Sequence, residues 1–142
     1  MLNLVYTRAG SLGLIPARWP GGSPWGTVTL ETKGRRSGRT RAIVVTWVEQ
    51  DGRRYLVSML GDGSDWVRNV RAAGGEAVVH RRGRQKVRLE EVPAEEGAPI
   101  LRTYLQKTAI STRRHLRVDP KAPIEEFRRI APDHPVFQIV EV

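Results

Sequence analysis

The sequence contains no cysteine. This absence excludes a disulfide scaffold, a metal site built from thiolates and a cysteine nucleophile. The three histidines, His80, His115 and His134, are too far apart for metal-ligand spacing, so we expect no metal site. A chain without cysteine fits a reducing compartment, and we expect a cytoplasmic protein.

Several signatures of catalysis and targeting are also missing. The sequence has neither a G-x-S-x-G nucleophile elbow nor a G-x-x-x-x-G-K-[ST] phosphate loop. No apolar run approaches the roughly 20 residues of a membrane span, and the first residues do not resemble a signal peptide. No side chain is identified as catalytic. An enzyme with this sequence would therefore take its chemistry from a bound cofactor.

Positive charge is the main feature of the composition. The 142 residues, which we expect to form a single domain (1–142), carry 24 basic and 15 acidic side chains, a net charge of +9. Residues 1–50 hold seven basic and two acidic groups, residues 51–90 nine and five, and residues 91–142 eight of each. The excess in the first ninety residues would attract an anion: a nucleic acid, an acidic membrane surface or a phosphorylated cofactor.

The hydrophobic pattern is mostly that of strands. Short runs that alternate or are rich in β-branched residues occur at 27–32, 42–48, 55–60, 77–80, 85–92 and 136–142. Asp51-Gly52 and Gly83 are turn signals between neighbouring runs. The run 42–48 is almost continuously apolar, which predicts a buried central strand. We expect a mainly β (α+β) protein built as a small antiparallel barrel of about six strands.

Two to four short helices complete this prediction. Helical periodicity occurs at 66–73, 99–107 and 124–130, with Ser64 or Asp65 as the cap of the first helix and Gly74 at its end. Residues 1–24 are dense in glycine and proline and form an irregular lead-in. Its leucines and other apolar residues would cap the core, cover a pocket or touch a membrane surface.

The segment Lys33-Gly-Arg-Arg-Ser-Gly-Arg-Thr-Arg41 concentrates five cations, two glycines and two hydroxyls between two predicted strands. Gly34 and Gly38 permit a tight turn whose amides can point at one anion. Arginine adds forked hydrogen bonds to phosphate oxygens. From composition alone, a phosphate site and a solvated basic hairpin are about equally favoured.

A second segment, Leu60-Gly-Asp-Gly-Ser-Asp-Trp-Val-Arg-Asn-Val-Arg71, is a glycine-containing loop that leads into a helix. The first amides of a helix favour an anion or an electron-rich ring edge. The loop lacks the third glycine of a dinucleotide fingerprint. Taken alone, Trp66 is better interpreted as a core anchor and Asn69 as a surface residue.

Together, Thr32 to Arg41, Asp51-Gly-Arg-Arg-Tyr-Leu-Val57 and Trp66-Val-Arg-Asn-Val-Arg-Ala-Ala-Gly74 resemble the deazaflavin (coenzyme F-420)-dependent nitroreductases. Members of that family are split β-barrel oxidoreductases. The resemblance implies that the basic hairpin binds the phosphate and acidic tail of the cofactor, and that the second segment lies along the deazaflavin ring. The implied cofactor-binding residues are Lys33, Arg35, Arg36, Ser37, Gly38 and Arg41 in the hairpin, and Met59, Leu60, Gly61, Trp66 and Asn69 along the ring.

The resemblance predicts the cofactor better than the substrate. Leu60-Gly-Asp-Gly63 replaces a Ser-Lys-Gly-Gly stretch of the better-known nitroreductases, and Thr46 replaces a tyrosine common in their substrate pocket. The predicted reaction is hydride transfer from reduced coenzyme F-420 to a small electrophile such as a quinone, an enone or a nitroaromatic. Neither the proton donor nor the choice between monomer and homodimer follows from the sequence.

Three alternatives remain open at this point. The same barrel and phosphate site would serve flavin mononucleotide (FMN), or a protein that carries the cofactor without turnover. A basic nucleic-acid-binding barrel ranks last, although Arg81 to Arg88 forms a second basic strip. Only 6% of the residues are aromatic, which disfavours base stacking. We therefore expect a small-molecule partner and no nucleic acid.

Overall fold

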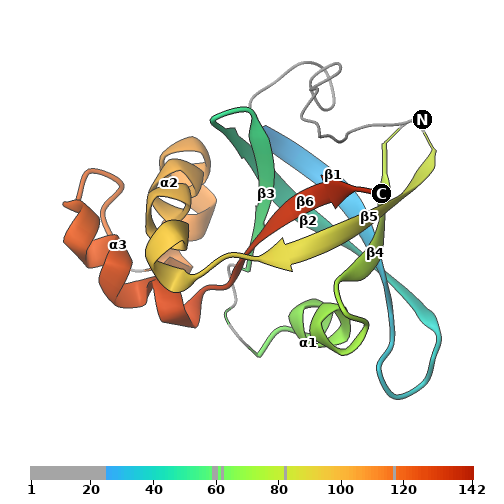
Figure 1. Cartoon of the computed structure of the whole chain (residues 1–142). Coiled ribbons are helices and arrows are strands. Elements are labelled where there is room, and N and C mark those ends of the chain that lie inside the picture. The colour runs from blue at the N-terminus through green and yellow to red at the C-terminus, as the bar shows by residue number, and fades with distance from the viewer. Residues whose placement is uncertain (1–24, 59–60, 62, 82, 117) are drawn as a thin grey trace.

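A computed structural model of the chain describes residues 25–58, 61, 63–81, 83–116 and 118–142. Six strands form a closed barrel in the order β1-β2-β3-β6-β5-β4, and every pair of neighbours is antiparallel (Figure 1). The strands are β1 (Trp25–Lys33), β2 (Thr40–Gln50), β3 (Arg53–Val57), β4 (Glu76–His80), β5 (Arg84–Glu91) and β6 (Val136–Glu141). The predicted fold class is confirmed, while the expected lead-in 1–24 lies outside the described residues.

The turn signals are confirmed. Asp51 and Gly52 both adopt positive φ, 54° and 78°, in the tight turn between β2 and β3. Gly83, with φ of 102°, lies in the turn between β4 and β5. Two consecutive residues of positive φ match the right-handed twist of the strands that they join.

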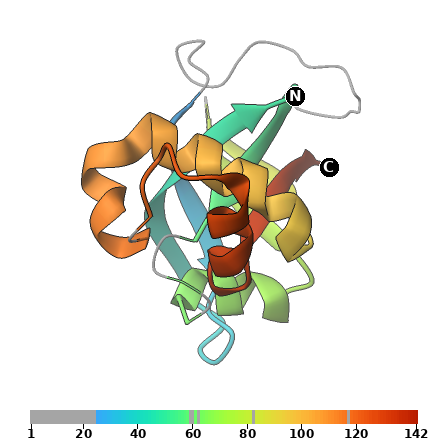
Figure 2. The same ribbon diagram turned by 90° about the vertical axis from the view of Figure 1, so that its left-hand side faces the viewer.

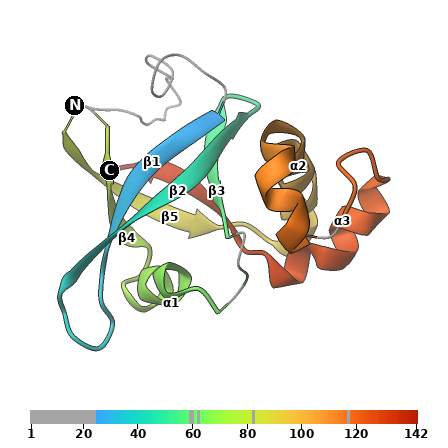
Figure 3. The ribbon, with the colours of Figure 1, turned by 180° about the vertical axis from the view of Figure 1, so that it is seen from behind.

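Strand β2 differs from its prediction as a wholly buried strand. Val45, Trp47 and Val48 are buried, but Ile43 is 46% exposed and Val44 is 65% exposed. Strand β2 pairs with β1 from Thr40 to Val48, but with β3 only between Trp47 and Gln50. Among the described residues, its first half therefore pairs with β1 alone and lies next to α1 (Asp65–Ala72) (Figure 3), while β1 also pairs with β4 over Thr29–Glu31.

One of the three predicted helices differs in length from the prediction. The helices α1 and α3 (Ile124–Ile130) agree with it to within a residue at each end, and η1 (Ala131–Asp133) follows α3. However, α2 is not short: it runs over Ala94–Leu116 and contains Pro99. The prediction started the helix at this proline, a common first residue. The preceding turn is nevertheless helical because Gly97 and Ala98 are buried, and a Cβ on Gly97 would lie 3.3 Å from a methyl carbon of Val136.

The barrel has one core inside and a second outside. The inner core contains Leu30, Trp47 and Leu56 among others, and it includes three side chains of α1, at the end of the barrel. The outer core lies between the barrel and the pair α2 and α3, which cover one side of it (Figure 2). The described residues include no helix with the length and apolar character that crossing a membrane requires.

Candidate functional site

The turn between β1 and β2 is held by its own hydrogen bonds. The amide of Gly34 donates to the carbonyl oxygen of Arg39 at 2.7 Å, and the amide of Gly38 donates to the carbonyl oxygen of Gly34 at 2.9 Å. The amide of Arg39 donates to Ser37 Oγ at 3.1 Å. Gly38 has a φ of 72°, which glycine adopts without strain. The sequence prediction of a tight glycine turn is confirmed here.

The turn leaves two adjacent amides available. The amide of Arg35 donates to Oδ1 of Asn69 at 3.1 Å, so four of the six amides of residues 34–39 have protein acceptors. Those of Arg36 and Ser37 have none in the described part of the chain. The hydroxyl of Ser37 accepts a hydrogen bond but donates none within the described residues, so its proton is available to a ligand. Consecutive free amides of this kind bind anions.

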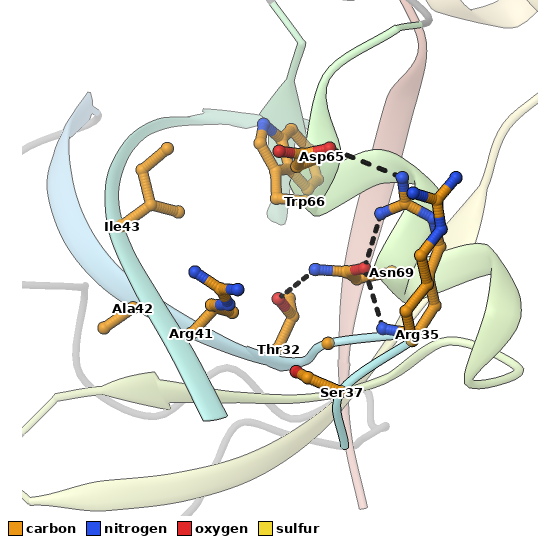
Figure 4. A pocket seen from close by; sticks show the side chains of 11 residues that line it. Thr32, Arg35, Ser37, Arg41, Ala42, Ile43, Asp65, Trp66 and Asn69 are labelled. Carbon is orange, nitrogen blue, oxygen red and sulfur yellow. Dashed lines mark hydrogen bonds and ion pairs between the residues drawn. The ribbon is translucent and has the colours of Figure 1, made fainter. Parts of the chain in front are cut away.

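Asn69 on α1 connects the helix to the turn. Its side chain is buried, and Oδ1 also accepts from Nη1 of Arg35 at 2.8 Å, while Nδ2 donates to Oγ1 of Thr32 at 3.3 Å (Figure 4). A second guanidinium nitrogen of Arg35 lies 3.4 Å from the Asp65 carboxylate. The guanidinium of Arg35 is therefore directed toward α1.

A pocket of about 350 Å³ lies between the turn and α1. Three arginines and one aspartate line it, so its charge is positive. Within the described residues, the side chains of Arg36 and Arg41 form no hydrogen bond or ion pair, so their guanidinium groups are available to a ligand. The lining residues are Thr32, Gly34, Arg35, Arg36, Ser37, Arg41, Ala42, Ile43, Asp65, Trp66 and Asn69.

Six of the eleven residues implied by the resemblance line this pocket: Arg35, Arg36, Ser37, Arg41, Trp66 and Asn69. Lys33 and Gly38 belong to the same hairpin but are exposed and do not line it. Gly61 is buried elsewhere, where a Cβ would lie 3.1 Å from the carbonyl oxygen of Asp133. Met59 and Leu60 lie outside the described residues.

Sequence reasoning missed five lining residues: Thr32, Gly34, Ala42, Ile43 and Asp65. Ala42 and Ile43 belonged to the strand predicted to be buried, and Asp65 was considered only as a helix cap. A signal for Thr32 and Gly34 existed, because both lie in the segment Thr32 to Arg41 that carries the family resemblance.

Trp66 belongs to both the pocket and the core. It is buried, and its ring centroid lies 5.4 Å from that of Phe137, with the planes tilted by 57°. Aromatic pairs prefer tilted or offset arrangements of this kind. The interpretation of Trp66 as a core anchor is confirmed. The same side chain also lines the pocket.

The loop that enters α1 is anchored at residues the sequence did not single out. Ser58 is buried, and its hydroxyl donates to the carbonyl oxygen of Gly61 at 2.6 Å. Ser64 occupies the N-cap position as predicted, but its hydroxyl lies 3.1 Å from that of Ser58 and makes no cap hydrogen bond. Nδ1 of His134 donates to the carbonyl oxygen of Ser58 at 3.2 Å, which ties the loop to the segment before β6.

Thr46 does not line this pocket. It lies in the part of β2 that α2 covers, where its side chain is hydrogen-bonded to that of Tyr104. Burial raises the pKa of the Tyr104 hydroxyl, and the hydrogen bond from Thr46 opposes this shift. The position that the resemblance associated with a substrate tyrosine is therefore separate from the arginine-lined pocket.

Two cations of the second basic strip are paired with carboxylates. Arg84 forms two hydrogen bonds to Glu31, at 2.7 and 3.1 Å, and Arg88 pairs with Glu90. The guanidinium of Arg84 first, and then His80, lower the pKa of Glu31 from 4.5 to about 2. Paired arginines offer little charge to a nucleic-acid backbone, so these contacts disfavour the nucleic-acid alternative.

The sequence matches one protein-family model over residues 5–125, that of the F420H(2)-dependent quinone reductases. The match spans most of the chain. The chain belongs to this family. It is therefore an oxidoreductase that uses the deazaflavin coenzyme F-420, and the suspected family relationship is confirmed.

Two solved structures with TM-scores above 0.5 show the same fold. A protein of unknown function from Agrobacterium tumefaciens (Atu2129) is 14% identical, with a TM-score of 0.57; 81% of this chain aligns with only 48% of that protein. A Clostridium acetobutylicum protein of the pyridoxinephosphate oxidase family, related to general stress protein 26, is 10% identical, with a TM-score of 0.53 and coverages of 81% and 74%. An F420-H2-dependent reductase (FDR-A) is 25% identical, with a TM-score of 0.44 and coverages of 80% and 92%. No curated protein matches the sequence significantly.

The described residues contain no group of three or more histidine, aspartate or glutamate side chains that could hold a metal ion.

Proposed function

We propose that this quinone-reductase family member reduces a small electrophile, of the quinone, enone or nitroaromatic class, with coenzyme F-420 bound over the β1–β2 turn. The phosphate of the cofactor would be held by the free amides of Arg36 and Ser37, the Ser37 hydroxyl, and the guanidinium groups of Arg36 and Arg41. The observation that carries the proposal is that, in the described part of the chain, two free amides lie beside two arginine side chains without a partner at one pocket. An anion there satisfies donors that are otherwise left to solvent.

The reduced deazaflavin supplies a hydride to the acceptor when bound. The protein itself positions the cofactor and the acceptor and shields them from water. Trp66 and Ile43 give the cationic pocket an apolar wall, which disfavours water near a flat ring. The proton that follows the hydride would come from solvent or a nearby hydroxyl.

We call the amides of Arg36 and Ser37, the Ser37 hydroxyl and the guanidinium groups of Arg36 and Arg41 the phosphate seat. Titration of the protein with coenzyme F-420, followed by the fluorescence of the cofactor, tests whether this site binds phosphate. We expect Arg36→Ala and Arg41→Ala each to weaken binding by about 1.5–3 kcal/mol, the usual contribution of a hydrogen bond to a charged group. This corresponds to a Kd increase of roughly 10- to 150-fold. Arg39→Ala is the matched control, because Arg39 is an exposed arginine of the same turn that does not line the pocket. Wild-type affinity in both pocket variants would disprove the proposed seat.

The same protein distinguishes the remaining alternatives. Tighter binding of FMN than of coenzyme F-420 would favour the flavin alternative. Tight binding of reduced coenzyme F-420 without oxidation by a soluble quinone, an enone or a nitroaromatic would favour a carrier. We expect oxidation, detected as the return of deazaflavin absorbance, with at least one of these acceptors.

A further inference from the structure

Asn69 lines the pocket, yet its polar atoms face the protein. The side chain is only 4% exposed. Two donors of Arg35 occupy the two acceptor positions of Oδ1, and one Nδ2 proton is given to Thr32. Little of this amide is left for a ligand, although the family resemblance implies that Asn69 lies along the deazaflavin ring.

The contacts of Asn69 determine the shape of the turn. They join α1 to a residue 34 positions earlier, at the start of the turn. By accepting from the Arg35 amide, Oδ1 fixes the peptide that precedes the two free amides of Arg36 and Ser37. By accepting from Nη1, it holds the Arg35 guanidinium toward α1, where Asp65 also lies.

Thr32 anchors this arrangement from the other side. It is a buried residue of β1, and its hydroxyl oxygen accepts from Nδ2 of Asn69 at 3.3 Å. The amide plane of Asn69 is thus held at both ends, which fixes which atom faces Arg35. Buried polar groups with several partners orient one another in this way.

We infer that Asn69 is a positioning residue: through Arg35 it holds the turn in the shape that binds phosphate, and it does not bind the deazaflavin ring. Arg35 then acts as the connection between α1 and the turn, and Arg36 and Arg41 supply the charge. This inference rests on the proposed phosphate seat.

A double-mutant cycle with two ligands tests it. Asn69→Ala, Arg36→Ala and the double variant are titrated with coenzyme F-420 and with the corresponding deazaflavin nucleoside, which has the ring and the ribityl chain but no phosphate. We expect Asn69→Ala to weaken coenzyme F-420 about tenfold, equivalent to about 1.4 kcal/mol, and to leave the affinity for the nucleoside unchanged. The effects of Asn69→Ala and Arg36→Ala should be strongly non-additive, since both act on one seat.

A milder variant, Thr32→Val, keeps the inference testable if Asn69→Ala fails to fold. Thr32→Val keeps the shape of the side chain and removes the acceptor of Nδ2, so we expect a smaller loss of coenzyme F-420 affinity and again no change for the nucleoside. Equal losses for both ligands would show that Asn69 contacts the ring, and additive effects of Asn69→Ala and Arg36→Ala would show that Asn69 does not act through this phosphate seat. Either result would overturn the inference. Failure of the proposed seat is a different result, in which Arg36→Ala itself leaves coenzyme F-420 affinity unchanged.

Discussion

Substitutions of Trp66 should separate its contribution to the stability of the protein from its contribution to cofactor binding. The side chain is 7% exposed and packs against Phe137 in the inner core. Truncating a large buried aromatic residue to alanine costs about 3–5 kcal/mol. Because one side of Trp66 borders a pocket of about 350 Å³, we expect the lower end, about 3 kcal/mol.

The melting temperature gives this prediction a numerical form. Unfolding entropy averages about 2.1 cal/mol/K per residue, or about 0.3 kcal/mol/K for 142 residues. A loss of about 3 kcal/mol then lowers Tm by about 10 °C. Thermal unfolding followed by circular dichroism measures the shift.

Trp66→Phe is the matched control, because it retains an aromatic ring against Phe137. We expect it to lose less than half as much Tm as Trp66→Ala, whereas affinity for coenzyme F-420 should fall in both variants. A Tm for Trp66→Ala within about 2 °C of the wild type would refute the reasoning, since normal core truncations of this size are far more costly. Equal Tm losses in the two variants would refute the role assigned to the ring contact.

Two further predictions concern the barrel. Gly75 has a φ of 94°, and a Cβ there would lie 2.7 Å from a backbone oxygen of β5, whereas Gly74 has a φ of 67° and open space around it. Gly75→Ala should therefore lose at least twice as much urea-unfolding free energy as Gly74→Ala, and equal losses would contradict the predicted clash. Arg84 is the main cause of the low pKa of Glu31, about 2 in the folded protein against 4.5 ordinarily. Because the folded pKa is depressed, the stabilisation by this carboxylate is complete above about pH 4.5 and disappears as the pH falls toward 2. The Tm difference between wild type and Glu31→Gln should shrink over that interval, and a constant difference would count against the ion pair.

Much of the barrel was predictable because its signals are local. Asp51-Gly52 and Gly83 specify tight turns through the positive φ that they permit, and the strands beside them follow from alternation of apolar residues. The basic turn at residues 33–41 was also found from the sequence, since its glycines and arginines lie within nine residues. The hydrogen bonds that the amides of Gly34 and Gly38 donate also stay within this turn.

The errors occurred where distant contacts decide the outcome. Ile43 and Val44 have the composition of a buried strand, but they are exposed because β3 is too short to pair with them. Strand β3 has five residues, and β2 has eleven. Similarly, α2 begins five residues before Pro99 because its first turn packs against β6, which lies some forty residues later in the sequence.

By itself, the sequence determined an antiparallel barrel without thiol chemistry and with a cationic turn suited to a phosphate, since turn preference and charge are properties of neighbouring residues. Only the tertiary structure decided which donors of that turn remain available. Asn69, thirty-four residues after Arg35, takes one amide and one guanidinium nitrogen, and the amides of Arg36 and Ser37 remain. That division depends on the packing of α1 against the end of the barrel, and no local pattern encodes it.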